Sequence, residues 1–191
     1  MSRKVRRVPV ALDAKDVTEL SAAAIRIMLR GADELIMSGG RGLLAKVLKG
    51  SRQKSVLEHE LDQSPAYGAL SDLSLQQITA RIDWLIINHY LDIEYDYRLP
   101  LLVYAPRGWE IERETYADEM LARLDELLDA TDETGSLSWL TGKNPQVLLL
   151  VLEKIAASAD AKYLPILDRW SKKSSKRFRR KISVTQDALR R

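Results

Sequence analysis

The spacing of apolar residues predicts a mainly helical chain that contains one short β-hairpin. Apolar residues recur near every 3.6 positions, the period of one helix face, over residues 16–37 and again from Ser74 to Leu91. Between Asp92 and Val103 they alternate with polar residues, which is typical of half-buried strands. Helical spacing then returns and continues to the C-terminus.

Glycine and serine residues separate the predicted helices of this first region. Residues 38–42 read SGGRG, and we expect a flexible turn there, after the first helix. Gly50 and Ser51 interrupt the next apolar run, and Ser51 is a candidate N-cap of the helix that follows. Ser74 and Gln77 have the spacing of a capping box, which defines the start of the third helix.

The rest of the chain is predicted to be helical throughout. Residues 110–133 contain ten acidic residues and two arginines along an apolar stripe, with a polar break expected at 131–135. Three more helices are expected over residues 146–158, 161–173 and 176–190. Pro145 opens the first of these, and its VLLLVL run is apolar nearly all round and should be buried.

Cations and hydroxyl groups gather around the helix predicted after Ser51. The candidate phosphate-binding residues there are Lys46, Lys49, Ser51, Arg52, Gln53, Lys54 and Ser55. Free backbone N–H groups at a helix start, together with cations and hydroxyls, suit a phosphate group. A solvated loop with ordinary surface lysines is an equally simple interpretation.

One face of the Ser74 helix adds further candidates. Gln76, Gln77 and Arg81 lie on it and could contact DNA. Trp84 and Ile87 lie on its C-terminal half and are too apolar for a free surface. We therefore expect that half of the face to pack on another segment or on a partner protein.

Four short motifs follow one another in the first region: Lys49-Gly50-Ser51, Tyr67-Gly68, the helix end L-I-x-x-x-Y-L at residues 85–91, and Pro106-Arg107-Gly108-Trp109, expected to close the hairpin. In this order they resemble the RQC domain, the winged helix on the C-terminal side of the motor in RecQ helicases. The resemblance covers about residues 16–109. It implies a winged helix in which Lys49, Ser51 and the residues just after Ser51 contact backbone phosphates.

The resemblance also implies a role in DNA binding for the hairpin tip. Tyr97 and Arg98 would lie where the family places its strand-separating aromatic residue, and both are candidate DNA contacts. The neighbouring strand carries three carboxylates, Asp92, Glu94 and Asp96, which phosphate would repel. These carboxylates argue against strand separation by this hairpin.

The predicted fold class is a winged helix, mainly α with a small β-hairpin wing, followed by an α-helical domain. We divide the chain into a basic arm (1–15), an RQC-like domain (16–112), an acidic connecting helix (113–135) and a helical domain with a basic tail (136–191). The order of helices in the last part resembles one HEAT- or armadillo-type unit, which is fewer than the roughly three that a stable solenoid needs.

The net charge of +3 conceals three blocks of opposite sign. Residues 1–58 carry twelve Lys and Arg against six Asp and Glu, residues 59–170 carry nine against twenty, and residues 171–191 carry nine against one. Lys173, Lys176, Arg177 and Arg180 form a second candidate phosphate surface in the last block. The alternative is that this basic tail folds back and neutralises the acidic middle.

Other function classes find little support in the sequence. The chain has no cysteine and two histidines, and it lacks G-x-S-x-G, H-E-x-x-H and the P-loop pattern, so we expect no enzyme, no metal and no cofactor. No apolar run reaches about 18 residues and no signal peptide is apparent, so we expect a cytoplasmic protein without a membrane partner.

The leading hypothesis is a non-catalytic protein that contacts the phosphate backbone of duplex or branched DNA. The alternative is a protein-interaction or scaffold module that retains the winged fold. Such a module would use Trp84, Ile87 or the helical tail to dock a partner, such as a helicase motor on another chain.

Overall fold

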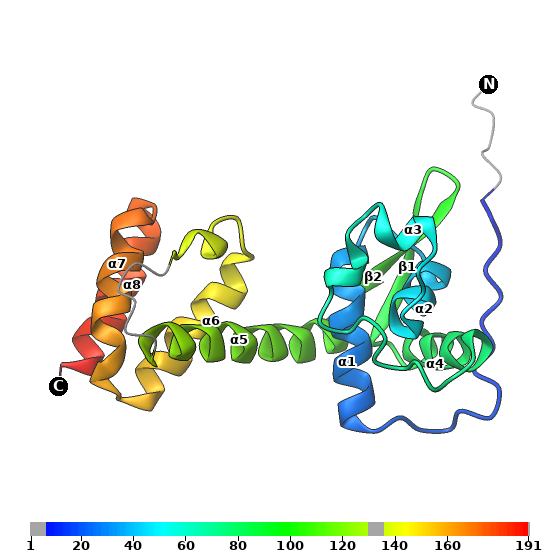
Figure 1. Ribbon diagram of the computed structural model, residues 1–191, viewed down its shortest axis with the longest axis horizontal. Coiled ribbons are helices and arrows are strands. Elements are labelled where there is room, and N and C mark those ends of the chain that lie inside the picture. The colour runs from blue at the N-terminus through cyan, green and yellow to red at the C-terminus, as the bar shows by residue number, and fades with distance from the viewer. Residues whose placement is uncertain (1–6, 130–135, 191) are drawn as a thin grey trace. The chain divides into compact units, whose positions relative to one another are not determined.

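The computed structural model describes residues 7–129 and 136–190 of the chain (Figure 1). Residues 1–6 of the basic N-terminal arm and the polar break predicted at 131–135 lie outside the described residues. The chain forms two compact units, Met1–Glu112 and Arg113–Arg191, and each is described by itself. No described helix is long and apolar enough to cross a membrane.

The first unit is a group of helices followed by an antiparallel hairpin, as the fold class predicts (Figure 1). Its elements are α1 (Ala22–Ala32), the 3-10 turn η1 (Asp33–Leu35), α2 (Arg41–Lys49), α3 (Lys54–Leu57), the 3-10 turn η2 (Leu61–Gln63), α4 (Leu75–Ile87), β1 (Leu91–Asp96) and β2 (Leu99–Tyr104). Helix α5 (Pro106–Asp129) begins in this unit, and from Arg113 onward it belongs to the second unit.

The first helix is shorter than its apolar pattern predicts. We expected it over residues 16–37, but it begins after Ser21, whose side chain accepts a hydrogen bond from the Ala24 amide. Residues before Ser21 are not helical because their backbone bonds to another helix, as described below. Gly31 does not split the helix; a Cβ there would lie 3.0 Å from the Ala66 Cβ, so its absence allows close packing.

The glycine-rich segment 38–42 is non-helical over residues 38–40, as the predicted turn requires, whereas its last two residues belong to α2. Gly40 is the N-cap residue of α2, and Arg41 and Gly42 form its first turn. The Leu102 amide of β2 donates to the Gly39 carbonyl at 2.9 Å, and Leu102 accepts from Met37 at 3.0 Å. The segment therefore attaches the start of α2 to the hairpin.

The core of the first unit is formed by the inward faces of α1, α2, α4 and the hairpin. Ile78, Ile82 and Leu85 of α4 are fully buried, and burying each such side chain contributes roughly 1.5–3 kcal/mol. The capping box predicted for this helix is confirmed, with both Ser74–Gln77 bonds present. Helix α4 is thus fixed at its start and along its apolar face.

The hairpin has the predicted alternation and a two-residue turn. Leu91 pairs with Tyr104 and Asp96 with Leu99, and Tyr97 in the turn has a positive φ of 52°. Pro106-Arg107-Gly108 does not close the hairpin as we expected; these residues form the first turn of α5. Proline suits this position because its fixed φ fits the first turn of a helix.

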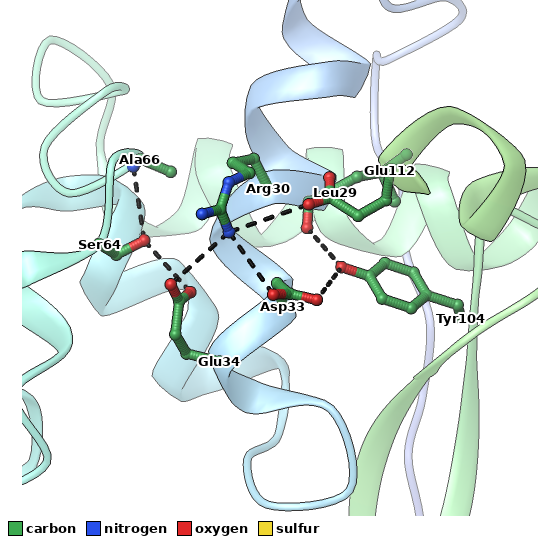
Figure 2. Close-up of polar contacts among 8 residues, drawn as sticks. All are labelled: Leu29, Arg30, Asp33, Glu34, Ser64, Ala66, Tyr104 and Glu112. Atoms are coloured by element: carbon green, nitrogen blue, oxygen red, sulfur yellow. Dashed lines mark hydrogen bonds and ion pairs between the residues drawn. The ribbon is translucent and has the colours of Figure 1, made fainter. Parts of the chain in front are cut away.

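A group of charged and polar side chains joins α1 to the hairpin and to the start of α5 (Figure 2). The buried Arg30 guanidinium lies 3.6 Å from Asp33, 3.6 Å from Glu34 and 3.8 Å from the buried Glu112. The Tyr104 hydroxyl donates to the Leu29 carbonyl at 3.0 Å. Burial raises the pKa of Tyr104 well above its ordinary value, so the hydroxyl keeps the proton that it donates.

The second unit is helical throughout its described residues. Its elements after α5 are the 3-10 turn η3 (Ser138–Leu140), α6 (Pro145–Ser158), the 3-10 turn η4 (Ala161–Tyr163), α7 (Leu164–Lys173) and α8 (Lys176–Leu189). Asn144 caps α6 and Ser175 caps α8. Val147, Val151 and Ile155 of α6 are fully buried, as the apolar VLLLVL run predicts.

Two glycines near helix starts should respond oppositely to alanine. A Cβ on Gly108 would lie 1.9 Å from the Tyr90 carbonyl oxygen, whereas a Cβ on Gly42 would meet nothing within 4 Å. We expect Gly108→Ala to lower the free energy of unfolding by at least about 2 kcal/mol, because a backbone atom must move. Gly42→Ala should raise it by up to about 1 kcal/mol through helix propensity. Urea unfolding measures both, and equal effects would contradict this packing.

The partly exposed Glu34 provides a test of pH dependence. Loss of water raises the pKa of its carboxyl above 4.5, although its own backbone and Arg30 oppose the rise. The folded state then binds this proton more tightly than the unfolded state, so this group lowers the free energy of unfolding as the pH rises above 4.5. We expect Glu34→Gln to give a small stabilisation at pH 7 in urea unfolding and a smaller one at pH 4. Destabilisation at pH 7 would show that the Arg30 ion pair outweighs burial.

Candidate nucleic-acid interface

The connector between α2 and α3, residues 50–53, depends on a glycine at its start. Gly50 ends α2 in the left-handed region with φ 74°, and the Ser51 amide donates to the Lys46 carbonyl at 2.9 Å. A Cβ on Gly50 would also lie 3.1 Å from the Gly68 Cα. Both the backbone angle and this close approach therefore favour glycine.

The loop that contains Tyr67 and Gly68 lies directly against the end of α2. The Gly68 amide donates to the Val47 carbonyl at 2.9 Å, and the Leu70 amide donates to Leu48 at 2.8 Å. The Lys49 ammonium donates to the Ser71 carbonyl. Two motifs that are separate in the sequence, Lys49-Gly50-Ser51 and Tyr67-Gly68, thus form one structural feature.

Ser51 is not the N-cap of the following helix, so that prediction is wrong. Its hydroxyl accepts a hydrogen bond from the Gln53 amide at 3.3 Å, and Gln53 is the N-cap residue of α3. Helix α3 has four residues, too short for a strong macrodipole. Attraction of phosphate to this connector must come mainly from its side chains.

The candidate cations of the connector differ in exposure and in whether their charges already have a partner. Arg52 is exposed and Lys46 is half-buried, and neither has an ion-pair partner among the described residues. Lys54 pairs with Glu58 at 3.2 Å, and the Lys49 ammonium donates to the Ser71 carbonyl of the loop. The Ser55 hydroxyl is buried with no hydrogen-bond partner within the described ranges, so it does not present itself to solvent.

The polar candidates on α4 are mostly engaged within their own helix. The Gln77 side chain accepts from the Ser74 amide at 2.9 Å, and the Arg81 guanidinium donates to the Gln77 carbonyl at 3.1 Å. Gln76 is exposed. Gln76 is therefore the candidate on this helix whose side chain is most readily presented to a ligand.

Part of the C-terminal half of the α4 face, at Trp84, is covered by residues near the N-terminus of the chain. The Trp84 indole donates to the Thr18 carbonyl at 3.1 Å and stacks on Tyr90 at 5.8 Å between ring centroids. The prediction that Trp84 packs on another segment is confirmed, and that segment belongs to the same chain. The same prediction is wrong for Ile87 within the described residues, because its side chain is 48% exposed.

A buried carboxylate on α4 was not predicted from the sequence. Asp83 is 2% exposed; its carboxylate binds the Arg41 guanidinium at 2.5 and 2.7 Å and accepts from the Asp13 amide at 2.9 Å. Asp83 follows the buried Ile82 directly, and an acidic residue beside an apolar stripe was the available signal. This contact joins α2, α4 and the N-terminal segment.

The hairpin tip is the most exposed part of the first unit that carries an aromatic residue. Tyr97 is 73% exposed and Leu99 61%. The Val8 amide donates to the Arg98 carbonyl at 3.1 Å, and the Tyr95 hydroxyl donates to the Val8 carbonyl at 3.0 Å. The N-terminal segment therefore follows the hairpin before it crosses α4.

The exposed side of β1 is acidic, as the alternation predicts. Asp92, Glu94 and Asp96 are all exposed. No group of His, Asp and Glu suited to a metal ion occurs among the residues that the structure describes. The carboxylates instead leave one side of the hairpin repulsive to phosphate.

The comparison with protein families agrees with this fold and these motifs. The helices followed by a hairpin are those of a winged helix, and the family match is to the RQC domain over residues 12–121, more than half of the chain. The chain belongs to the RQC domain family, a non-catalytic winged helix generally associated with DNA binding in RecQ helicases. Comparisons with curated proteins and with solved structures found no match.

The family match extends beyond the span that the motifs indicated. It begins at residue 12, within the segment that crosses α4, and continues to residue 121 within α5. The HEAT- or armadillo-type identity of the helices after it stays a prediction. The family assignment therefore applies to the first unit and the start of the second.

The buried Asp83 should be essential for stability. Asp83→Ala removes the only described ion-pair partner of Arg41 and the acceptor of the Asp13 amide. We expect a loss of about 3 kcal/mol in the free energy of unfolding. Asp96→Ala, on the exposed side of β1, is the control and should change it by less than about 0.5 kcal/mol. Similar losses in the two variants, measured by urea unfolding, would contradict the role of Asp83.

Proposed function

We propose that this protein is a non-catalytic DNA-binding protein that contacts the phosphate backbone of duplex or branched DNA. The contact is made by the α2–α3 connector of its RQC unit. One observation carries the proposal: Lys49-Gly50-Ser51 and Tyr67-Gly68 are joined by backbone hydrogen bonds and by the close approach of Gly50 and Gly68. These contacts hold the connector in place while Arg52 stays exposed. A fixed backbone beside free cations suits phosphate binding.

Different residues of the connector have different roles in this proposal. Arg52 and Lys46 attract the phosphate because their charges are not used within the described fold. Lys49 is a positioning residue, because its ammonium holds the loop through the Ser71 carbonyl. The Ser51 hydroxyl and the amide groups of residues 54 and 55 provide hydrogen bonds to the phosphate oxygens.

The hairpin contributes through its tip. Tyr97 and Arg98 reach beyond the acidic side of β1, which would repel a nearby strand. Gln76 and Arg81 lie on a helix whose C-terminal half is partly covered by the chain itself, so α4 offers few base contacts. Binding should therefore depend on DNA structure and salt more than on base sequence.

The alternative function is a protein-interaction module that docks a partner, such as a helicase motor on another chain. Of the two residues that suggested it, Trp84 already packs on Thr18 and Tyr90, and Ile87 is exposed. This alternative predicts no preference for duplex or forked DNA over single strands. A titration with the three DNA forms at two salt concentrations distinguishes the two functions.

Charge removal at the connector tests the proposal directly. We expect the double variant Lys46→Gln, Arg52→Gln to reduce the slope of log K against log salt by about 1.8, since each neutralised phosphate contributes about 0.9. Fluorescence anisotropy with duplex DNA measures this slope. The charge-matched control is Lys15→Gln, Arg26→Gln, at two other exposed cations of the same unit, and it should leave the slope unchanged.

A slope in the connector variant equal to that of the wild type would remove the connector from the DNA-binding surface. An equal reduction in the control variant would show only a general effect of net charge.

A further inference from the structure

The last helix begins with an unusual concentration of positive charge. Five of the first six residues of α8 are cations, and all five side chains are exposed: Lys176, Arg177, Arg179, Arg180 and Lys181. None of them has an ion-pair partner among the described residues. This is the densest group of exposed, unneutralised cations within the described ranges.

This arrangement opposes the stability of the helix. The N-terminus of a helix carries a partial positive charge, so cations in its first turns are unfavourable. Lys176 and Arg180, like Arg177 and Lys181, are four residues apart, where like charges repel each other. The charges are therefore not explained by the folding of α8.

The acidic residues of α5 do not neutralise these cations. Glu114 and Asp118 pair with Lys154 of α6 at 2.8 and 2.9 Å, and Asp125 pairs with Lys162 at 3.1 Å. Helix α5 thus uses these carboxylates on other lysines of the same unit. The alternative raised by the sequence, a basic tail neutralised by the acidic middle, is not what the described residues show.

Packing of α8 leaves one cationic face directed outward. Ile182, Thr185 and Leu189 are buried, and Phe178 contacts Trp170 at 5.4 Å between ring centroids. Helical spacing places Lys176, Arg177 and Arg180 together on the side opposite these buried residues. Lys173, at the end of α7, lines the same cavity as Phe178, on the packed side of α8, so it does not belong to this outward face.

We propose that this outward face of α8, formed by Lys176, Arg177 and Arg180, binds the phosphate backbone of nucleic acid. It is a second contact, which does not depend on the α2–α3 connector of the first unit. Several exposed cations on one helix face are the electrostatic feature that a polyanion recognises.

Nucleic acid is favoured over an anionic membrane by the apolar side of the helix. A helix that lies on a membrane surface inserts an exposed apolar face. The apolar side of α8 is instead buried in its own unit. Val184, which helical spacing places on the cationic side, is the one exposed large hydrophobic residue among the described residues of α8. The RQC domain on the same chain also belongs to a family associated with DNA binding.

The test compares two charge-matched triple variants of the full chain. The first is Lys176→Gln, Arg177→Gln, Arg180→Gln. The control is Lys143→Gln, Lys162→Gln, Lys172→Gln, three cations of the same unit that already contact Tyr116, Asp125 and Asp168. Glutamine keeps helix propensity, so α8 should still form, and circular dichroism checks this.

Binding to duplex DNA is measured by anisotropy between 50 and 200 mM salt. With three phosphates released, the slope of log K against log salt should fall by about 2.7 in the first variant. The wild type should then lose about 40-fold more affinity than this variant over that salt range. The control should keep the wild-type slope.

The remaining outcomes each decide the question. A wild-type slope in the α8 variant, or an equal fall in the control, overturns the proposal. Loss of binding to phosphatidylserine vesicles with unchanged DNA binding also overturns it, in favour of a membrane surface. If the connector variant keeps the wild-type slope while the slope of the α8 variant falls, the α8 proposal is supported and the connector proposal fails.

Discussion

The first unit depends on the close approach of Gly50 and Gly68. Both residues have positive φ values, and a side chain on Gly50 would meet the backbone of Gly68. Because neither has a Cβ, backbone amides of the loop after η2 can donate hydrogen bonds to carbonyls at the end of α2. Those bonds fix the direction in which the chain leaves α2, and hence the positions of Arg52 and α3.

The N-terminal segment reduces the surface of α4 that is available to a ligand. In this unit the helix before the hairpin carries a good cap and a regular apolar stripe, yet part of its other face is covered by the chain itself. Asp83 lies at the centre of this cover because it binds both Arg41 and the Asp13 backbone. The surfaces left for a ligand are the connector and the hairpin tip.

Charge is distributed differently in the two units. In the first, the buried Arg30 is surrounded by Asp33, Glu34 and Glu112, so its charge is used within the fold (Figure 2). In the second, the acidic residues of α5 pair with Lys154 and Lys162. The cations of α8 are left over from this pairing, and a net charge of +3 for the whole chain conceals them.

The sequence by itself determined the elements whose signals are local. The Ser74–Gln77 cap, the alternation of β1 and the helices after Pro145 follow from bonds and periods that span a few residues, and the structure confirms them. The motifs of the RQC family were visible in the same way, since each is a short run of residues.

Only the tertiary structure decided which of these residues are free. Lys49 and Arg52 look alike in the sequence, but Lys49 is bound to a carbonyl at position 71 while Arg52 is exposed. The start of α1, the cover over Trp84 and the burial of Asp83 likewise result from partners 42 to 70 residues away. Such contacts depend on how the whole chain packs, and no local period or propensity encodes them.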